Sequence, residues 1–253
     1  MAEPPAPIDL AARLRALTQA RIALGRTGQS LTTTSLLDFE LAHARARDAV
    51  HARLDANALR DAIDGQDVVE VHSLASDRAT YLQRPDLGRL LDPADAALLG
   101  PSNAGVAIVI GDGLSATAVQ RHAGPLVVAL IARLANWSIA PIVLAHQARV
   151  ALGDEIGAAL VVDLVIMLIG ERPGLSAPDS LGAYLTWAPC PGRRDSERNC
   201  VSNIRPPHGL GYAVAAERIA WLAEQARTLR LTGTQLKDES PAGVRASQLP
   251  YGR

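Results

Sequence analysis

The length, composition and charge of the chain limit what it can be. It has 253 residues, of which 48% are hydrophobic and 3% aromatic, and its formal net charge is -1. That length allows one large domain, or a compact domain with an appended arm. No apolar run reaches the roughly 20 residues that span a bilayer, and a near-neutral chain has no overall basic excess to attract nucleic acid. We therefore expect neither a membrane nor a nucleic acid as partner.

Residues 1–55 predict a helical arm. Leucines and one isoleucine between Leu10 and Leu24 form an apolar stripe at helical spacing. Glycines and hydroxyl residues interrupt the pattern at 25–34, and these residue types favour turns and helix caps. A second helix is expected at 36–54. We predict that this arm precedes an α/β domain covering residues 56–253.

The rest of the chain alternates short apolar runs with helical patterns. This alternation predicts a Rossmann-like parallel sheet flanked by helices. The expected strands are 68–71, 106–110, 139–144, 161–169 and 181–187. One expected helix follows the strand at 106–110 and runs to Trp137, and two others cover 154–160 and 211–229.

Ligands of such sheets gather beyond the carboxyl ends of the strands, so the loops there are the candidate sites. Gly111-Asp112-Gly113 follows one strand, and a tight turn before a helix capped by Ser115 explains it better than a phosphate loop. The segment 146–155 contains Arg149, which could reach an anionic ligand, and Asp154, for which we favour a helix-capping role.

Two further segments supply polar side chains. Glu171 and Arg172 follow the strand at 161–169, where they form either a surface ion pair or, as their position favours, part of a ligand site. The charged run 193–198 is typical of a solvated face. The small polar side chains of residues 199–205 predict a loop that lines a large polar cofactor. We expect Cys200 there to be a lining thiol, because the sequence places no activating base beside it.

Several familiar site motifs are missing from the sequence. The six histidines show no HExxH motif or other close ligand spacing, so we expect no metal site built by the protein. Neither a GxSxG elbow nor a Walker loop is found.

Five motifs, in order along the chain, give the sequence a family likeness. LIGERPGLSAPDSLGAYLTW from Leu168 and ERNCVSNIRP from Glu197 resemble the small subunit of bacterial ethanolamine ammonia-lyase. RTGQSL from Arg26, LAHARARDAV from Leu41 and ARVALGDEIG from Ala148 support the resemblance. Each motif is short, but their common order makes the likeness specific.

The resemblance implies an enzyme that converts ethanolamine to acetaldehyde and ammonia by radical chemistry with adenosylcobalamin. It implies a hetero-oligomer in which the large subunit holds the substrate, so no catalytic residue is expected in this chain. The backbone amide of Val150 and the side chains of Glu171 and Cys200 match family positions that contact the cofactor. The amino terminus has neither a basic start nor an apolar block of signal-peptide length, so we expect the protein in the cytoplasm, and the resemblance adds a bacterial microcompartment as an alternative.

Two other functions stay open at this point. A free-standing dinucleotide-binding oxidoreductase would use the same α/β alternation, although the sequence lacks the GxGxxG fingerprint. A structural or regulatory subunit that has lost the cofactor would keep the family motifs. The chain also lacks the DxHxxG motif that supplies a cobalt ligand in many cobalamin proteins, since Gln120 precedes His122 where an aspartate is required. The cofactor's own dimethylbenzimidazole is therefore expected to stay on cobalt.

Overall fold

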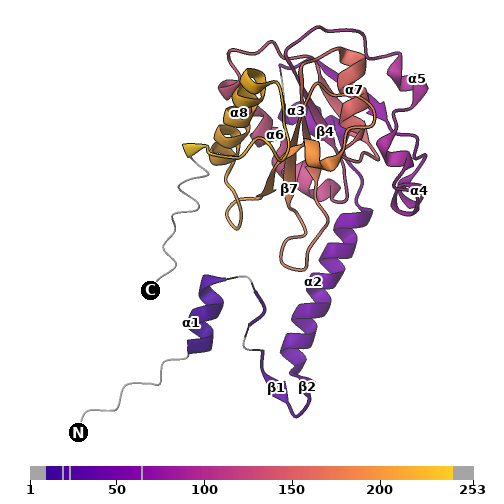
Figure 1. The fold of residues 1–253 in the computed structure, drawn as a ribbon. Helices are drawn as coiled ribbons and strands as arrows, with labels where there is room; N and C mark the ends of the chain where they lie inside the picture. Colours follow the sequence, from indigo (N-terminus) through magenta and orange to yellow (C-terminus); the bar gives the residue numbers. More distant parts are fainter. Residues whose placement is uncertain (1–9, 19, 23, 64, 242–253) are drawn as a thin grey trace.

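The computed structural model describes residues 10–18, 20–22, 24–63 and 65–241. Its body is a sheet with helices on both faces, as the sequence predicts, but the sheet has six strands where the sequence predicted five (Figure 1). In the order in which they lie side by side, the strands are β3 (Val68–His72), β5 (Ile142–His146), β4 (Val106–Gly111), β6 (Leu164–Gly170), β7 (Leu181–Trp187) and β8 (Asn199–Ile204).

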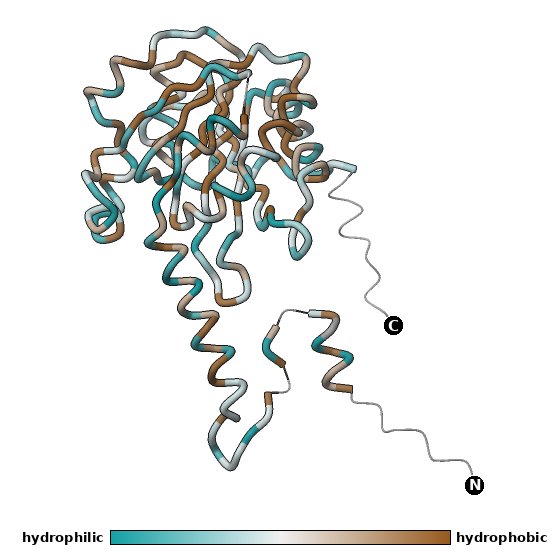
Figure 2. Tube along the Cα trace, turned by 180° about the vertical axis from the view of Figure 1, so that it is seen from behind, coloured by the Kyte–Doolittle hydropathy of each residue, from teal (hydrophilic) through white to brown (hydrophobic). Residues whose placement is uncertain are grey.

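Four strands of this sheet are parallel, and the last two are not. β3, β5, β4 and β6 run in one direction, whereas β7 is antiparallel to both β6 and β8. Every residue of β4 and β6 is buried, which is typical of parallel strands covered on both faces. The hydrophobic residues accordingly concentrate on the strands in the body of the molecule (Figure 2).

The helices pack against the sheet as two layers. One apolar cluster joins α3, α6 and α8 to one face, and a second joins α7 to the other face (Figure 1). The helices and short turns of the body are α3 (Ala56–Ala62), α4 (Arg78–Gln83), η1 (Leu87–Arg89), α5 (Pro93–Ala96), α6 (Ala116–Arg133), α7 (Leu152–Leu160), η2 (Asp195–Glu197) and α8 (Tyr212–Leu229).

The predicted arm contains two helices, α1 (Leu10–Leu17) and α2 (Thr33–His51), with the hairpin β1 (Arg26–Thr27) and β2 (Ser30–Leu31) between them. The hairpin occupies the expected break, and the Thr32 side chain caps α2 by accepting from the amide of Ser35. α1 ends at Leu17, before the last residues of the predicted apolar stripe, and isolated helices of this length are marginally stable. The division at residue 55 stays a prediction.

Two predicted boundaries were wrong near α7. The strand at 161–169 begins only at Leu164, because Val161 has a positive φ of 55° and ends α7 instead. The strand at 139–144 is shifted to Ile142–His146, although Ile139 forms a single bridge with Val106. Within the described ranges, no helix is both long and apolar enough to cross a membrane.

The segment 199–205 was wrongly predicted to be a loop. Residues 199–204 form the edge strand β8, in which Val201 and Ile204 are buried and the intervening positions are exposed. A register shift opposite Leu181 and Ala183 breaks the alternation of buried and exposed positions. Polar residues and this irregularity together hide the strand from a periodicity argument.

Candidate functional site

An open cavity of about 400 Å³ lies where the loops after β4, β5 and β6 converge. Gly113, Val150 and Glu171 line it, one from each of these three loops, together with Tyr184 of β7. The predicted meeting of strand-end loops is therefore confirmed for Val150 and Glu171.

The turn after β4 is built by close packing of two backbones. Gly113 has a φ of 58°, and a Cβ atom there would lie 2.2 Å from the carbonyl oxygen of Gly170. The amide of Leu114 donates to this same carbonyl at 2.9 Å. Ser115 caps α6, since its Oγ accepts from the amide of Ala118 at 3.2 Å. The glycines thus serve a tight turn, as expected, that joins the ends of β4 and β6.

Asp112 braces the loop that presents Val150. Its carboxylate is almost fully buried and accepts from the backbone amides of Gln147 at 3.1 Å and Ala148 at 2.9 Å. Arg78 lies 3.5 Å away and offsets the negative charge. Burial raises the pKa of Asp112, while the two amides and Arg78 act in the opposite direction. The brace ties the end of β4 to the loop after β5.

Tyr81 supports the same loop from α4. Its hydroxyl donates to the carbonyl of Ala148 at 2.9 Å, and the guanidinium of Arg149 stacks over its ring at 4.3 Å. Val150 is half-buried, and its N–H donates to no protein acceptor among the described residues. The loop is therefore held firmly, while the Val150 amide at the cavity has no acceptor within the described part of the chain.

Glu171 is fixed by hydroxyl groups and not by its neighbour Arg172. Its carboxylate accepts from Ser180 Oγ and Ser202 Oγ, each at 2.5 Å, and from the amide of Asn203 at 3.3 Å. The alternative of an ion pair with Arg172 was wrong, because within the described residues these hydroxyl and amide donors hold the Glu171 carboxylate and no ion pair joins it to Arg172. Because three donors hold the carboxylate, its position at the cavity is defined before any ligand binds.

Cys200 lies beside the cavity on a strand. It pairs with Tyr184 across β7 and β8, and the Tyr184 side chain lines the cavity. The residue is exposed at its edge position, yet its sulfur is sufficiently enclosed that burial raises the pKa of the thiol to about 11. A hydrogen bond with Tyr184 lowers that pKa, and the charge of Glu171 adds to the increase. Cys200 is therefore a neutral thiol at physiological pH, which suits lining and not nucleophilic attack.

An ion pair missed by the sequence analysis fixes the start of β8. Asp154 does not cap α7, whose first residue has no side-chain cap, and Arg198 is not on a solvated face. Instead Arg198 donates to both carboxylate oxygens of Asp154 at 2.6 Å, and each side chain is 2% exposed. The apolar surroundings require each charge to have a partner, and spacing alone could not reveal a contact spanning 44 residues.

The fold and this cavity define a Rossmann-like α/β domain with an open site of polar and apolar groups at the strand ends. Such a site is suited to forming one wall of a larger binding site. The chain belongs to the ethanolamine ammonia-lyase light chain (EutC) family, whose model matches residues 8–237.

Relatives with the name ethanolamine ammonia-lyase small subunit cover most of the chain. The protein of Xanthomonas campestris pv. campestris (strain B100) is 54% identical over 244 residues, which are 92% of this chain and 89% of the relative. That of Pseudomonas aeruginosa (strain UCBPP-PA14) is 51% identical over 247 residues, or 94% and 90% of the two chains. That of Azotobacter vinelandii is 53% identical over 238 residues, or 90% and 88%.

Proposed function

We propose that this chain is the small subunit of an adenosylcobalamin-dependent ethanolamine ammonia-lyase, which converts ethanolamine to acetaldehyde and ammonia. Its open cavity would form one wall of the cofactor site, and a large subunit would provide the opposite wall and the substrate site. The observation that carries the proposal is the convergence of Val150 and Glu171 on one cavity, with Cys200 beside it, in a chain of this family.

The size and opening of the cavity fit part of a cobalamin. A cavity of about 400 Å³ cannot enclose a corrin with its nucleotide, but an open wall can contact one edge of it. The edge of a corrin carries amide groups, which both donate and accept hydrogen bonds. The cavity offers a backbone N–H and a carboxylate, and a neutral thiol lies beside it. These groups complement such an edge.

The chain would bind and orient the cofactor. Adenosylcobalamin, when bound, supplies the radical chemistry. The Val150 amide would donate to a carbonyl of the cofactor, and Glu171 would accept from an amide N–H. Cys200 would pack against it as a neutral thiol, and the covered surface would exclude water. No residue of this chain needs to contact ethanolamine.

His122 is unsuited to replace the cofactor's own base on cobalt. The residue is 5% exposed, and its Nδ1 is hydrogen bonded to the Tyr212 hydroxyl at 2.8 Å. It lies on α6, on the face of the sheet opposite α7. These contacts support the expectation that dimethylbenzimidazole stays on cobalt. A hetero-oligomer in the cytoplasm or in a microcompartment is part of the same proposal.

Co-expression with the large subunit tests the assembly. We expect a stable complex that releases ammonia from ethanolamine only when adenosylcobalamin is added. Failure to form a complex, or ammonia release without the cofactor, would contradict the proposal. Nicotinamide binding by the purified chain would instead support the oxidoreductase alternative.

Two substitutions test the cofactor wall within the assembled enzyme. Glu171→Gln and Cys200→Ala should weaken adenosylcobalamin binding while the complex still forms, as measured by equilibrium dialysis and gel filtration. Glu217→Gln, on α8 at the other face of the sheet, and Cys190→Ala, at a second exposed cysteine, are matched controls and should bind normally. Unchanged affinity in both test variants would favour a structural subunit without a cofactor role.

A further inference from the structure

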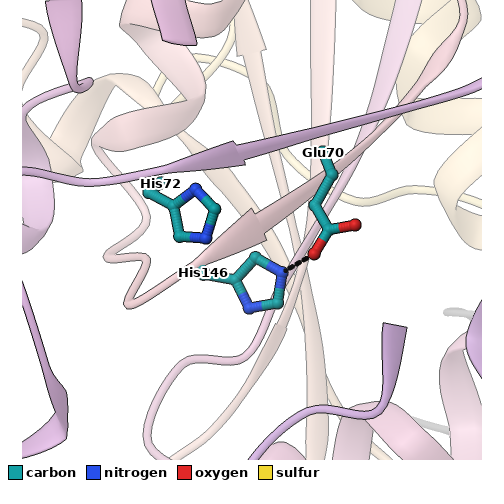
Figure 3. Close-up of side chains that lie close together, drawn as sticks. All are labelled: Glu70, His72 and His146. Carbon is teal, nitrogen blue, oxygen red and sulfur yellow. Dashed lines mark hydrogen bonds and ion pairs between the residues drawn. The ribbon is translucent and has the colours of Figure 1, made fainter. Parts of the chain in front are cut away.

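Glu70, His72 and His146 form a cluster that lies outside the proposed cofactor wall (Figure 3). Side chains two residues apart on a strand share one face, so Glu70 and His72 both project from the same side of β3. His146 is the register partner of His72 on the parallel strand β5. The sheet thus brings together residues that are 76 positions apart in sequence.

The three side chains offer ligand atoms within 4.8 Å of one another. The imidazole rings of His72 and His146 stack with centroids 4.8 Å apart and an interplanar angle of 16°. His146 Nε2 lies 2.6 Å from Glu70 Oε1, a hydrogen bond whose place a bound ion could take (Figure 3). One carboxylate and two imidazoles are the donor set of several three-ligand zinc sites.

Neighbouring groups orient these donors as outer partners of metal ligands do. Asp95 Oδ2 lies 2.8 Å from His72 Nδ1, which leaves Nε2 of that ring available to a cation. Arg60 donates to Glu70 Oε2 at 2.9 Å and so fixes one oxygen of the carboxylate. The other oxygen, Oε1, still faces His146.

We propose that Glu70, His72 and His146 bind a divalent transition-metal ion of the zinc class. Ligand atoms at 2.0 to 2.2 Å from one tetrahedral ion lie about 3.3 to 3.6 Å from each other. Glu70 Oε1 and His146 Nε2, now 2.6 Å apart, therefore have to separate slightly, and the His72 ring has to turn out of its stack on His146 to direct its nitrogen at the ion. His72 can make this movement because its side chain is 55% exposed. Three protein ligands leave the fourth position to water, and the adjoining cavity of about 280 Å³ gives an ion access to both histidines.

The ion would tie β3 to β5 at the base of the Val150 loop, because His146 is followed directly by the braced residues Gln147 and Ala148. The proposal does not depend on the cofactor. It requires only that the folded chain hold one ion at these three side chains.

Cobalt(II) titration of the purified, untagged full-length chain tests the site. The background carries Cys190→Ser and Cys200→Ser, because both exposed thiols could bind the ion. We expect one Co²⁺ per chain, detected by isothermal calorimetry and visible absorption, and displacement of cobalt by Zn²⁺. His72→Ala and His146→Ala should each weaken the affinity at least tenfold.

Exposed histidines elsewhere provide the matched controls. His51→Ala and His208→Ala should bind cobalt as the parent chain does. Asp95→Asn should weaken binding roughly 10 to 100-fold through the orientation of His72. Circular dichroism will show which variants fold, and the exposed His72 variant keeps the test valid if His146→Ala unfolds. The absence of saturable cobalt binding, or equal binding by the His72 variant and the controls, would overturn the proposal.

Discussion

The buried ion pair between Arg198 and Asp154 gives the sharpest prediction about stability. Arg198→Ala would leave the Asp154 carboxylate, which is 2% exposed, without its two charge-assisted hydrogen bonds at 2.6 Å. It would also remove donors to Thr186 Oγ1 at 2.8 Å and to the carbonyl of Arg193 at 3.0 Å. Breaking one side of a buried pair typically costs about 3 to 5 kcal/mol. We expect the free energy of unfolding to fall by about that amount.

Urea unfolding at pH 7 measures this loss, since the midpoint and slope together give the free energy of unfolding. Arg84→Ala is the matched control, because Arg84 pairs with Asp86 at 2.7 Å while its side chain is 61% exposed. That variant should leave the unfolding midpoint almost unchanged.

Replacing both members of the buried pair separates two explanations. Arg198→Met combined with Asp154→Leu should recover most of the lost stability, because an apolar pair leaves no charge without a partner. If Arg198→Ala cost less than about 1 kcal/mol, the reasoning would be refuted, because water would then have to reach the carboxylate. A double variant as unstable as the single one would show that the pair is needed for packing at the start of β8.

Three further predictions concern the cavity and its supports. In a Cys190→Ser variant, the alkylation rate of Cys200 should rise about tenfold per pH unit and level off near pH 11, where the thiol is fully ionised. A rate that levels off near pH 9.0, the ordinary pKa of a cysteine thiol, would contradict the enclosed position of Cys200. Gly113→Ala should lower the free energy of unfolding, measured with urea, by about 2 kcal/mol or more, because the new Cβ would overlap the Gly170 carbonyl and φ is positive at this position. An unchanged free energy of unfolding would disprove this close approach. Ser115→Ala should cost about 1 kcal/mol through the lost helix cap, and a thermal midpoint equal to the parent's would argue against it.

The sequence predicted the buried strands well because their apolar runs leave little alternative. β4 and β6 are buried at every position, and their apolar residues identified them directly. β8 was missed because half of its surface faces outward and its register shifts opposite β7. Edge strands have to satisfy one buried face only, so their composition resembles that of a loop.

The site was predictable where it depends on strand direction and unpredictable where it depends on register. Val150 and Glu171 follow parallel strands, so their loops had to converge. The contact of Arg198 with Asp154, and that of Glu70 with His146, depends on which residues face one another across the fold. Sequence spacing carries no information on such pairs, and for this reason the histidines showed no ligand pattern.

The change of strand direction at β7 explains why the cavity is open. Parallel strands need crossover connections, and α7 makes the one from β5 to β6, passing over β4, which lies between them. β6, β7 and β8 are antiparallel neighbours that are joined without an intervening α-helix, so this face of β7 and β8 has no helix of its own. Cys200 and Ser202 are exposed there, next to Glu171. The same topology that places these groups together leaves their outer side free for a second subunit.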